Sequence, residues 1–490
     1  MSTILKIAQN SIVLLVAQCI GYLLAFLYMM YSARYLGPAE FGILSFAIAF
    51  TSIINAIGDL GLQTLVTLEV ARDKGATAKY LANISLMKIL ISVVVIGIIA
   101  TVAGMSGYSA DTVWVLYLLG LAVIFNMFVP LYYGIYQGHE KMIYMGIGQV
   151  LNSAIIFIGV VVAVNLRQSI VVLAAVYAIA AISVLIYNLI ILRVKFHVPN
   201  KNARMLEFDP AFWKRIILRV LPFAFIVVFA SVYSWGDWVL LKIVQGDAVV
   251  GWYSAASRLP QLLIFIPLAL TSALYPIMSR SYRVADSALR LSAERSIKYL
   301  FIVGLPISIG VTLLADRIIN VIFGPAYSPT VISLQILIWS TPLNFTTFAL
   351  NSYLYATNRQ NALTKMYLAI TVFNLALNVI LIPMFSYVGA SAARVAADLA
   401  LLTMQLIFIS RSPDTIGTAR DIVTIVRVAA AGLGMAAVTI AVSSLNLILV
   451  VAVSALVYFG LTILLRTFDK TDLSFILQLT EIFGRKKNQP

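Results

Sequence analysis

The sequence predicts an all-α membrane protein with about fourteen transmembrane helices. Of its 490 residues, 62% are hydrophobic and only 11% are charged, and the mean hydropathy is +0.99. Soluble domains carry about twice that share of charged residues. Apolar runs of about 18 residues or more recur along the chain, and each can cross a hydrocarbon core about 30 Å thick. This composition indicates a polytopic membrane protein.

Charged residues or proline and glycine separate the apolar runs. Their approximate limits are residues 10–33, 41–70, 79–104, 112–137, 141–163, 169–194, 215–243, 249–277, 297–318, 329–357, 361–385, 388–410, 421–443 and 446–466. The first run is longer than a signal-peptide core and shows no small-residue cleavage site, so we expect an uncleaved first span.

A basic loop divides these spans into two halves. It contains Lys195, Lys201, Arg204 and Lys214, and its Asp209-Pro210 pair is typical of a helix N-terminus. We therefore predict an N-terminal lobe of six spans (1–194), a cytoplasmic linker (195–214), a C-terminal lobe of six spans (215–412), and two further spans with a basic tail (413–490).

The two halves share a repeated segment. Residues 37–50, GPAEFGILSFAIAF, align with residues 246–259, GDAVVGWYSAASRL, and five identities fall within eleven residues without a gap. A sixth identity, Leu65 with Leu274, extends the match. Chance matches of small residues occur in so biased a composition, but this clustering favours a duplication. Arg258 aligns with Ala49, so the halves are predicted to be alike in fold and different in charge.

The positions of the basic residues predict the orientation in the membrane. Of the 34 lysines and arginines, four fall on one side and three within spans, and the remaining 27 lie on the side of both termini. Cytoplasmic loops carry the excess of basic residues. We therefore expect cytoplasmic termini in a multi-pass protein of the cell membrane. The same rule explains the net charge of +15 without a nucleic-acid partner.

Arg258 is the main candidate for a binding residue inside the membrane. It lies about nine residues from the outer end of its span, or roughly 13 Å deep. A cation at that depth costs roughly 3 to more than 10 kcal/mol unless it meets water or a counter-charge. We therefore expect it to line a central cavity. Lys88 lies at a similar depth, where lining the cavity and reaching to the inner interface are both open.

Other charged residues complete the candidate site. Asp237 and Asp59 are predicted to be counter-charges at the cavity, and Arg34, near the outer end of the first span, is a further cavity candidate. Arg394 and Asp398 are four residues apart on one helix, a spacing at which they can neutralise each other, so we interpret that pair as structural.

The sequence shows no signature of an enzyme. It lacks the phosphate-loop pattern G-x-x-x-x-G-K-[ST] and the zinc pattern H-E-x-x-H. Its lone cysteine, Cys19, lies within the first span, which excludes a disulfide framework. The predicted outer loops are short, with single scattered carboxylates. We expect no catalytic residues, no metal and no cofactor.

Two stretches resemble a known superfamily. Residues 253–259, YSAASRL, followed by residues 267–269, PLA, and residues 274–280, LYPIMSR, resemble the matching part of bacterial lipid II flippases. Residues 33–42, ARYLGPAEFG, look still more like the polysaccharide (O-antigen, Wzx-type) flippases. Both groups belong to the MOP superfamily, which also contains the MATE multidrug exporters.

The resemblance implies two six-helix lobes around a central cavity that opens alternately to the two sides. It implies movement of a polyprenyl-linked oligosaccharide between leaflets, with Arg258 meeting the pyrophosphate. Expected partners are this lipid, membrane lipids, and glycosyltransferases or a polymerase of the same pathway, with the transporter itself a monomer. Alternatives are a MATE-like cation exporter, in which Asp59 and Asp237 would dominate, a lipid II-type flippase, and a non-transporting scaffold or unrecognised enzyme.

The orientation can be tested with reporter fusions. Reporters placed after Lys201 and after Arg485 should both report the cytoplasm, and a reporter after Asp247 should report the outside. A cytoplasmic signal at Asp247 would contradict the predicted number of spans.

Overall fold

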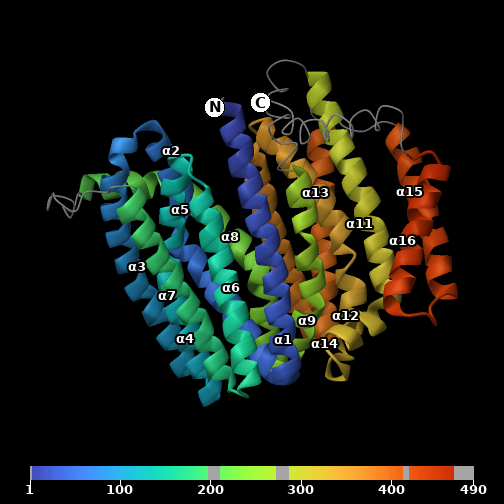
Figure 1. Ribbon diagram of the computed structural model, residues 1–490, viewed down its shortest axis with the longest axis horizontal. Coiled ribbons are helices and arrows are strands. Elements are labelled where there is room, and N and C mark those ends of the chain that lie inside the picture. The colour runs from blue at the N-terminus through green and yellow to red at the C-terminus, as the bar shows by residue number, and fades with distance from the viewer. Residues whose placement is uncertain (1–2, 197–209, 272–285, 412–418, 468–490) are drawn as a thin grey trace, which may run out of the picture. The chain divides into compact units, whose positions relative to one another are not determined.

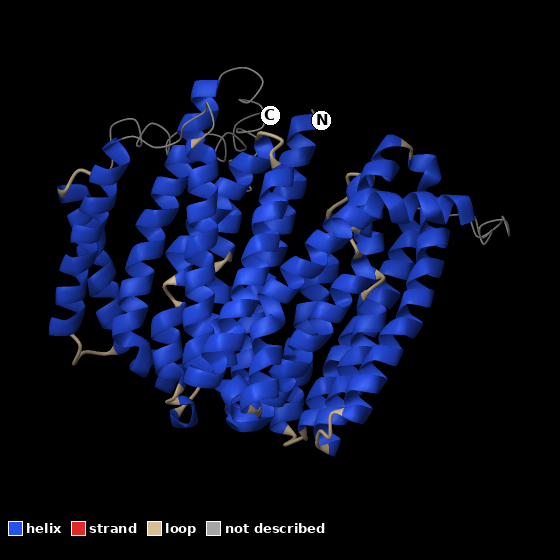
Figure 2. Ribbon diagram, turned by 180° about the vertical axis from the view of Figure 1, so that it is seen from behind, coloured by secondary structure: helices blue, strands red, loops and turns tan. Residues whose placement is uncertain are grey.

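The computed structural model describes residues 3–196, 210–271, 286–411 and 419–467, and within these ranges every regular element is a helix (Figures 1 and 2). The helices are α1 (Thr3–Asp59), α2 (Leu62–Arg72), η1 (Lys74–Ala76), α3 (Thr77–Met105), α4 (Ala110–Asn126), α5 (Val129–Gly138), α6 (Ile143–Asn165), α7 (Ile170–Lys195), α8 (Pro210–Gln245), α9 (Asp247–Leu263), α11 (Asp286–Ile322), η3 (Pro325–Tyr327), α12 (Thr330–Leu337), α13 (Ser340–Ala356), α14 (Gln360–Ser410), α15 (Ala419–Ala441) and α16 (Leu447–Leu464).

Eleven helical stretches among the described residues are long and apolar enough to cross a membrane. Two of the longest helices are each two helices joined at a bend, because Gly37 in α1 and Ser386 in α14 have non-helical backbone angles. The predicted all-α polytopic fold is confirmed, whereas the number of about fourteen spans stays a prediction.

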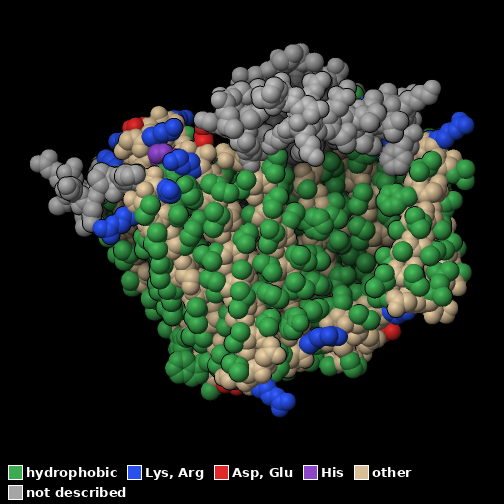
Figure 3. Space-filling model, viewed as in Figure 1, with side chains coloured by type: hydrophobic (Ala, Val, Ile, Leu, Met, Phe, Trp, Pro, Cys, Tyr) green, Lys and Arg blue, Asp and Glu red, His purple; other side chains and the backbone are tan. Residues whose placement is uncertain are grey.

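The outward face of α3 shows why this fold needs a bilayer. Ile89, Leu90, Val93, Val94 and Ile96 are each at least half exposed. Soluble proteins rarely expose so continuous an apolar surface. Figure 3 shows hydrophobic side chains over the middle of the face in view, with the described lysines and arginines concentrated towards its ends. The chain is a multi-pass membrane protein.

The chain divides into two compact units. The first comprises residues 1–265, 322–333 and 364–397, and the second comprises residues 266–321, 334–363 and 398–490. This division follows contact density rather than the order of the spans, so the lobe and linker boundaries predicted from the sequence stay a prediction. Most of the linker and the basic tail lie outside the described residues.

In the first unit, the part of α1 after its bend packs directly against α9. A Cβ added to Gly42 would lie 1.8 Å from the carbonyl oxygen of Asp247, and one added to Gly251 would lie 2.0 Å from that of Pro38. Under the alignment of the repeat, Gly42 corresponds to Gly251 and Pro38 to Asp247. The contact is therefore reciprocal, as the duplication predicts.

The turns that precede these two helices are also alike. Gly37 has φ 71° and ψ 175°, and Gly246 has φ 89° and ψ −174°. This backbone region is essentially restricted to glycine. Both copies of the repeat therefore enter their helix through the same kind of turn, which brings the backbones together at Gly42 and Gly251.

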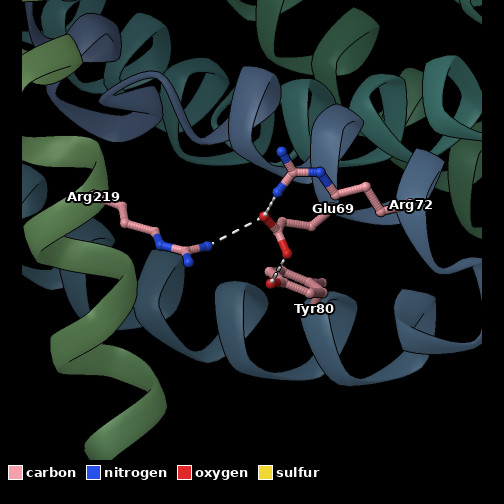
Figure 4. A network of polar contacts seen from close by, with 4 residues as sticks. All are labelled: Glu69, Arg72, Tyr80 and Arg219. Carbon is pink, nitrogen blue, oxygen red and sulfur yellow. Dashed lines mark hydrogen bonds and ion pairs between the residues drawn. The ribbon is translucent and has the colours of Figure 1, made fainter.

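The start of α8 attaches to the N-terminal helices. Phe212, Ile216 and Val220, spaced one turn apart, are buried in a cluster with side chains of α2, α3, α5 and α7. Beside this apolar face, Glu69 accepts hydrogen bonds from Arg219 of α8 at 3.2 Å and from other residues of α2 and α3 (Figure 4). Exposed ion pairs contribute about 0–1 kcal/mol, so the buried face supplies most of the attachment.

In the second unit, α15 and α16 pack against α11. The Tyr458 hydroxyl donates to the carbonyl of Ile302 at 2.7 Å. The Arg317 guanidinium donates to the carbonyls of Ser443 and Leu445 at 2.6 and 2.7 Å. These two carbonyls lie in the turn between α15 and α16, so Arg317 supplies donors for backbone acceptors that belong to neither helix.

The glycine contact can be tested by adding one methyl group. Gly42→Ala should destabilise the protein by about 1–3 kcal/mol or more, because the new Cβ meets backbone atoms that cannot rotate away. Gly104→Ala is the matched control, since Gly104 on α3 has no atom near its Cβ position. The measurement is the melting temperature of the purified protein in detergent. Equal melting temperatures for the two variants would contradict the contact.

Candidate functional site

Arg258 is buried inside the first unit with much of its hydrogen-bonding capacity unused. It is 8% exposed, and its Nη1 donates to Oε1 of Gln261 at 3.0 Å. Its Nε and Nη2 have no hydrogen-bond partner in the described part of the chain. None of the described carboxylates forms an ion pair with Arg258. The guanidinium charge is therefore not neutralised by the protein around it.

Arg258 lines a cavity of about 440 Å³, which we call the arginine cavity. Its wall is built from α1, α8, α9, the residue after α9, and α14, all within the first unit: Tyr22, Ala25, Phe26, Tyr28, Met29, Ile48, Ser234, Trp235, Arg258, Gln261, Leu262, Ile264 and Arg394. Aromatic rings from α1 and α8 share this wall with two arginines, and no carboxylate is among these side chains. The cavity suits an anion with an apolar or ring-shaped neighbour.

Arg394 is the second cation of the arginine cavity. Its Nη1 donates to the carbonyl of Tyr233 at 2.9 Å, and its guanidinium carbon lies 4.3 Å from the centre of the Tyr233 ring. Asp398, which the helical spacing suggested as its partner, accepts a hydrogen bond from Asn344 at 3.1 Å. The contacts with Tyr233 of α8 thus hold Arg394 in the cavity wall.

Lys88 and Asp59 lie together but do not line the arginine cavity. The Lys88 side chain is 0% exposed, and its Nζ lies 3.9 Å from Oδ1 of Asp59. It also donates to the carbonyls of Gly58 at 2.9 Å and Met127 at 2.6 Å. These carbonyls belong to the ends of α1 and α4, where the helical hydrogen bonds stop. Lys88 therefore joins two helix ends in the interior rather than reaching the interface.

Asp237 is fully buried in a separate polar cluster. Its Oδ2 accepts from the Tyr253 hydroxyl at 2.8 Å, and its Oδ1 accepts from Asn378 at 2.7 Å. Next to it, Trp238 donates to the Ser254 hydroxyl at 2.7 Å. This cluster joins α8, α9 and α14 and does not line the arginine cavity.

Arg34 is exposed near the end of the first half of α1 and does not line the cavity. Of the five predicted site residues, the structure therefore brings Lys88 and Asp59 together, and it places Arg258, Asp237 and Arg34 in three other surroundings. The contact of Gln261 with Arg258 could have been expected from the sequence, because the two residues lie one helical turn apart. The position of Arg394 in the cavity wall was not predicted, because its contact, Tyr233, is on another helix.

No metal site is evident among the described residues. They contain no group of three or more histidine, cysteine, aspartate or glutamate side chains close enough to share an ion. Asp237 has only amide and hydroxyl neighbours among its identified partners.

Comparison with known protein families shows which family the chain belongs to. A family model described as "Polysaccharide biosynthesis protein" matches residues 7–282, more than half of the sequence. The chain belongs to the polysaccharide biosynthesis protein family. A second family model, MatE, matches residues 222–380 of this family member.

Curated relatives of this polysaccharide biosynthesis protein span most of its length. The putative O-antigen transporter of Escherichia coli (strain K12) is 23% identical over 421 residues, which cover 83% of this chain and 97% of the relative. The probable low-salt glycan biosynthesis flippase Agl15 of Haloferax volcanii is 25% identical over 401 residues, which cover 79% and 80%. The resemblance to polysaccharide flippases of the MOP superfamily is confirmed.

Solved structures agree with this family fold. The inward closed conformation of the lipid II flippase MurJ superposes with a TM-score of 0.76 at 13% identity, covering 92% of this chain and 98% of MurJ. An inward-facing MATE family transporter of the MOP superfamily gives a TM-score of 0.68 at 14% identity, covering 79% and 93%. Likeness at this level of identity concerns the fold alone.

The position of Lys88 can be tested by removing its charge. Lys88→Met should lower stability by about 2–5 kcal/mol, because it leaves the carbonyls of Gly58 and Met127 without their donor and the Asp59 carboxylate without its counter-charge. Lys88→Met with Asp59→Asn should recover part of that loss. Melting temperature is the readout, and exposed Lys74→Met is the control. An unchanged melting temperature together with lost transport would instead place Lys88 in contact with the substrate.

Proposed function

We propose that this protein is a flippase that moves a polyprenyl-phosphate-linked oligosaccharide from the inner to the outer leaflet by alternating access. Its family and the names of its relatives support transport of a lipid-linked glycan. The observation that carries the proposal is Arg258, a buried cation with two unpaired nitrogens in the wall of the arginine cavity.

The chemistry of Arg258 fits a phosphate group. A guanidinium offers several N–H donors in a planar fork that can bind a phosphate through two hydrogen bonds at once. With Nη1 already used by Gln261, Nε and Nη2 remain as donors for a ligand. Arg394 adds a second positive charge to the same wall. A diphosphate therefore meets two cations in one cavity.

The cavity also lowers the barrier to crossing. A sugar–phosphate head cannot cross hydrocarbon unaided, because each desolvated polar group costs several kcal/mol. A cavity with two cations in its wall replaces part of the lost hydration without covalent chemistry. An inside-negative potential favours outward movement of an anion by roughly 2.3 kcal/mol per charge per 100 mV. No cofactor or catalytic step is needed for this function, and we propose none.

A cation exporter of the MATE type is the alternative. The match of residues 222–380 to the MatE family model favours it. The charge of the arginine cavity argues against it, because the charged side chains in its described wall are both arginines. Asp59 and Asp237, which a cation exporter would use, lie in other clusters.

The remaining roles follow from these positions. In this proposal Arg258 and Arg394 bind the phosphates, while Lys88, Asp59 and Asp237 hold the helices around the cavity. Further proposals are a monomer in the inner membrane with both termini cytoplasmic, and transient contact with glycosyltransferases or a polymerase of the same pathway. We assign exposed Arg34 a peripheral contact with the substrate, outside the arginine cavity.

Substitution of Arg258 tests the proposed function. Arg258→Ala should lower export at least tenfold, since a hydrogen bond to a charged group contributes about 1.5–3 kcal/mol. Arg258→Lys should retain part of the activity, because lysine keeps the charge and loses the planar fork. The measurement is export of labelled lipid-linked glycan in a strain that depends on this protein, read beside the membrane abundance of each variant.

Exposed Arg193→Ala on α7 is the matched control and should export normally. A second variant, Arg394→Ala, should reduce export as well. Full export by a normally abundant Arg258→Ala protein would contradict the role of Arg258 in carrying the substrate's charge.

A further inference from the structure

A second cavity lies next to the arginine cavity within the first unit. It has a volume of about 210 Å³, and its wall comes from α1, α4, α6 and α7. We call it the amide pocket, because one asparagine from each of three helices lines it: Asn55 of α1, Asn126 of α4 and Asn152 of α6. None of its lining side chains is charged.

The three amides are not used to hold the helices together. Within the described part of the chain, no side-chain hydrogen bond joins any of the three to another residue, and Oδ1 of Asn55 has no partner. The hydroxyl of Tyr177, in the same wall, also lacks one. A polar side chain inside a membrane bundle is costly and usually functional. Convergence of three such side chains on one space indicates a ligand that supplies the missing partners.

The chemistry of the pocket favours a neutral ligand rich in hydroxyl or amide groups. Each asparagine offers two N–H donors and a carbonyl acceptor, so the wall can both donate to and accept from one sugar hydroxyl. Tyr28 and Tyr177 add aromatic rings, with centroids 6.1 Å apart and planes at 89°. An aromatic ring has an apolar face that suits the C–H face of a sugar. The volume is on the order of one monosaccharide.

The two cavities share a wall. Tyr28 and Ile48 of α1 line both, and Arg258 is in the wall of the arginine cavity that they close. A phosphate at Arg258 therefore places the next chemical group of the substrate beside the amide pocket.

We infer that the amide pocket binds the uncharged sugar next to the phosphate of the carrier lipid, and that it selects neutral or N-acetylated sugars over acidic ones. This inference rests on the proposed function, which supplies the phosphate-linked substrate. It adds a site for the sugar itself, formed by α1, α4, α6 and α7.

Two soluble probes separate the sugar site from the phosphate site. One is a short-chain prenyl diphosphate, and the other is the same molecule bearing N-acetylglucosamine on its diphosphate. Binding of each to the purified full-length protein is measured by calorimetry. Asn152→Leu should weaken the sugar-bearing probe about tenfold, the effect of losing one or two hydrogen bonds, and should leave the sugarless probe unchanged. Asn55→Leu should behave in the same way.

The controls exclude a folding defect. Asn152→Leu should keep or raise the melting temperature, because it removes a polar group that has no partner in the protein. Asn165→Leu, on the exposed end of the same helix, should bind both probes normally. Arg258→Ala should weaken both probes equally.

The outcomes distinguish the two proposals. If Arg258→Ala weakens both probes while Asn152→Leu and Asn55→Leu weaken neither, the amide pocket holds only water and the inference is wrong, whereas the proposed function stands. If Arg258→Ala changes neither probe, the phosphate site and the proposed function fail. Tighter binding of a probe bearing glucuronic acid than of the N-acetylglucosamine probe would overturn the selectivity for neutral sugars.

Discussion

The backbone contact between the second half of α1 and α9 determines where the first unit can place its functional side chains. Only glycine at positions 42 and 251 allows the two helices to approach so closely. Arg258 follows Gly251 by seven residues, two helical turns, so both lie on one face of α9. The face that packs against α1 at its start therefore carries Arg258 to the cavity wall that α1 also forms. Small residues at a helix crossing thus determine the position of a charge further along.

The repeat makes the scaffold symmetric and leaves the charge asymmetric. The position equivalent to Arg258 in the first copy is Ala49, which is completely buried. A second arginine there would need its own counter-charge or water, at a cost of roughly 3 kcal/mol or more. Both copies of the repeat thus contribute the same glycine contact, but only the second copy contributes a buried cation, Arg258.

The buried charges fall into two kinds. Lys88 with Asp59, and Asp237 with its hydroxyl and amide neighbours, have partners at helix ends or helix crossings. Arg258 has one partner for three nitrogens. Removing a partner from a paired buried charge costs stability, whereas a buried cation without a counter-charge already lowers the stability of the fold that contains it.

The sequence predicted the fold class, the repeat and the position of Arg258 at a cavity wall, because these depend on local composition, spacing and depth along a helix. It did not predict the partners of Lys88 or Arg394. Those partners lie on other helices, and the pairing appears only once the helices pack. The i,i+4 spacing of Arg394 and Asp398 pointed along one helix, whereas their identified hydrogen bonds lead to Tyr233 on α8 and to Asn344 on α13. The amide pocket could not be predicted from the sequence, because its three asparagines lie on three different helices and each is a single polar residue in an apolar stretch.

Transport also limits how strongly either cavity can bind. A transporter must hold its ligand well enough to load and weakly enough to release. In the proposed function, two arginines at the phosphate and a few amides at the sugar would divide the affinity between sites on different helices, with α1 common to both walls. A shift of α1 relative to α8, α9 or α14 would then weaken several contacts together, because no single contact carries the whole binding energy.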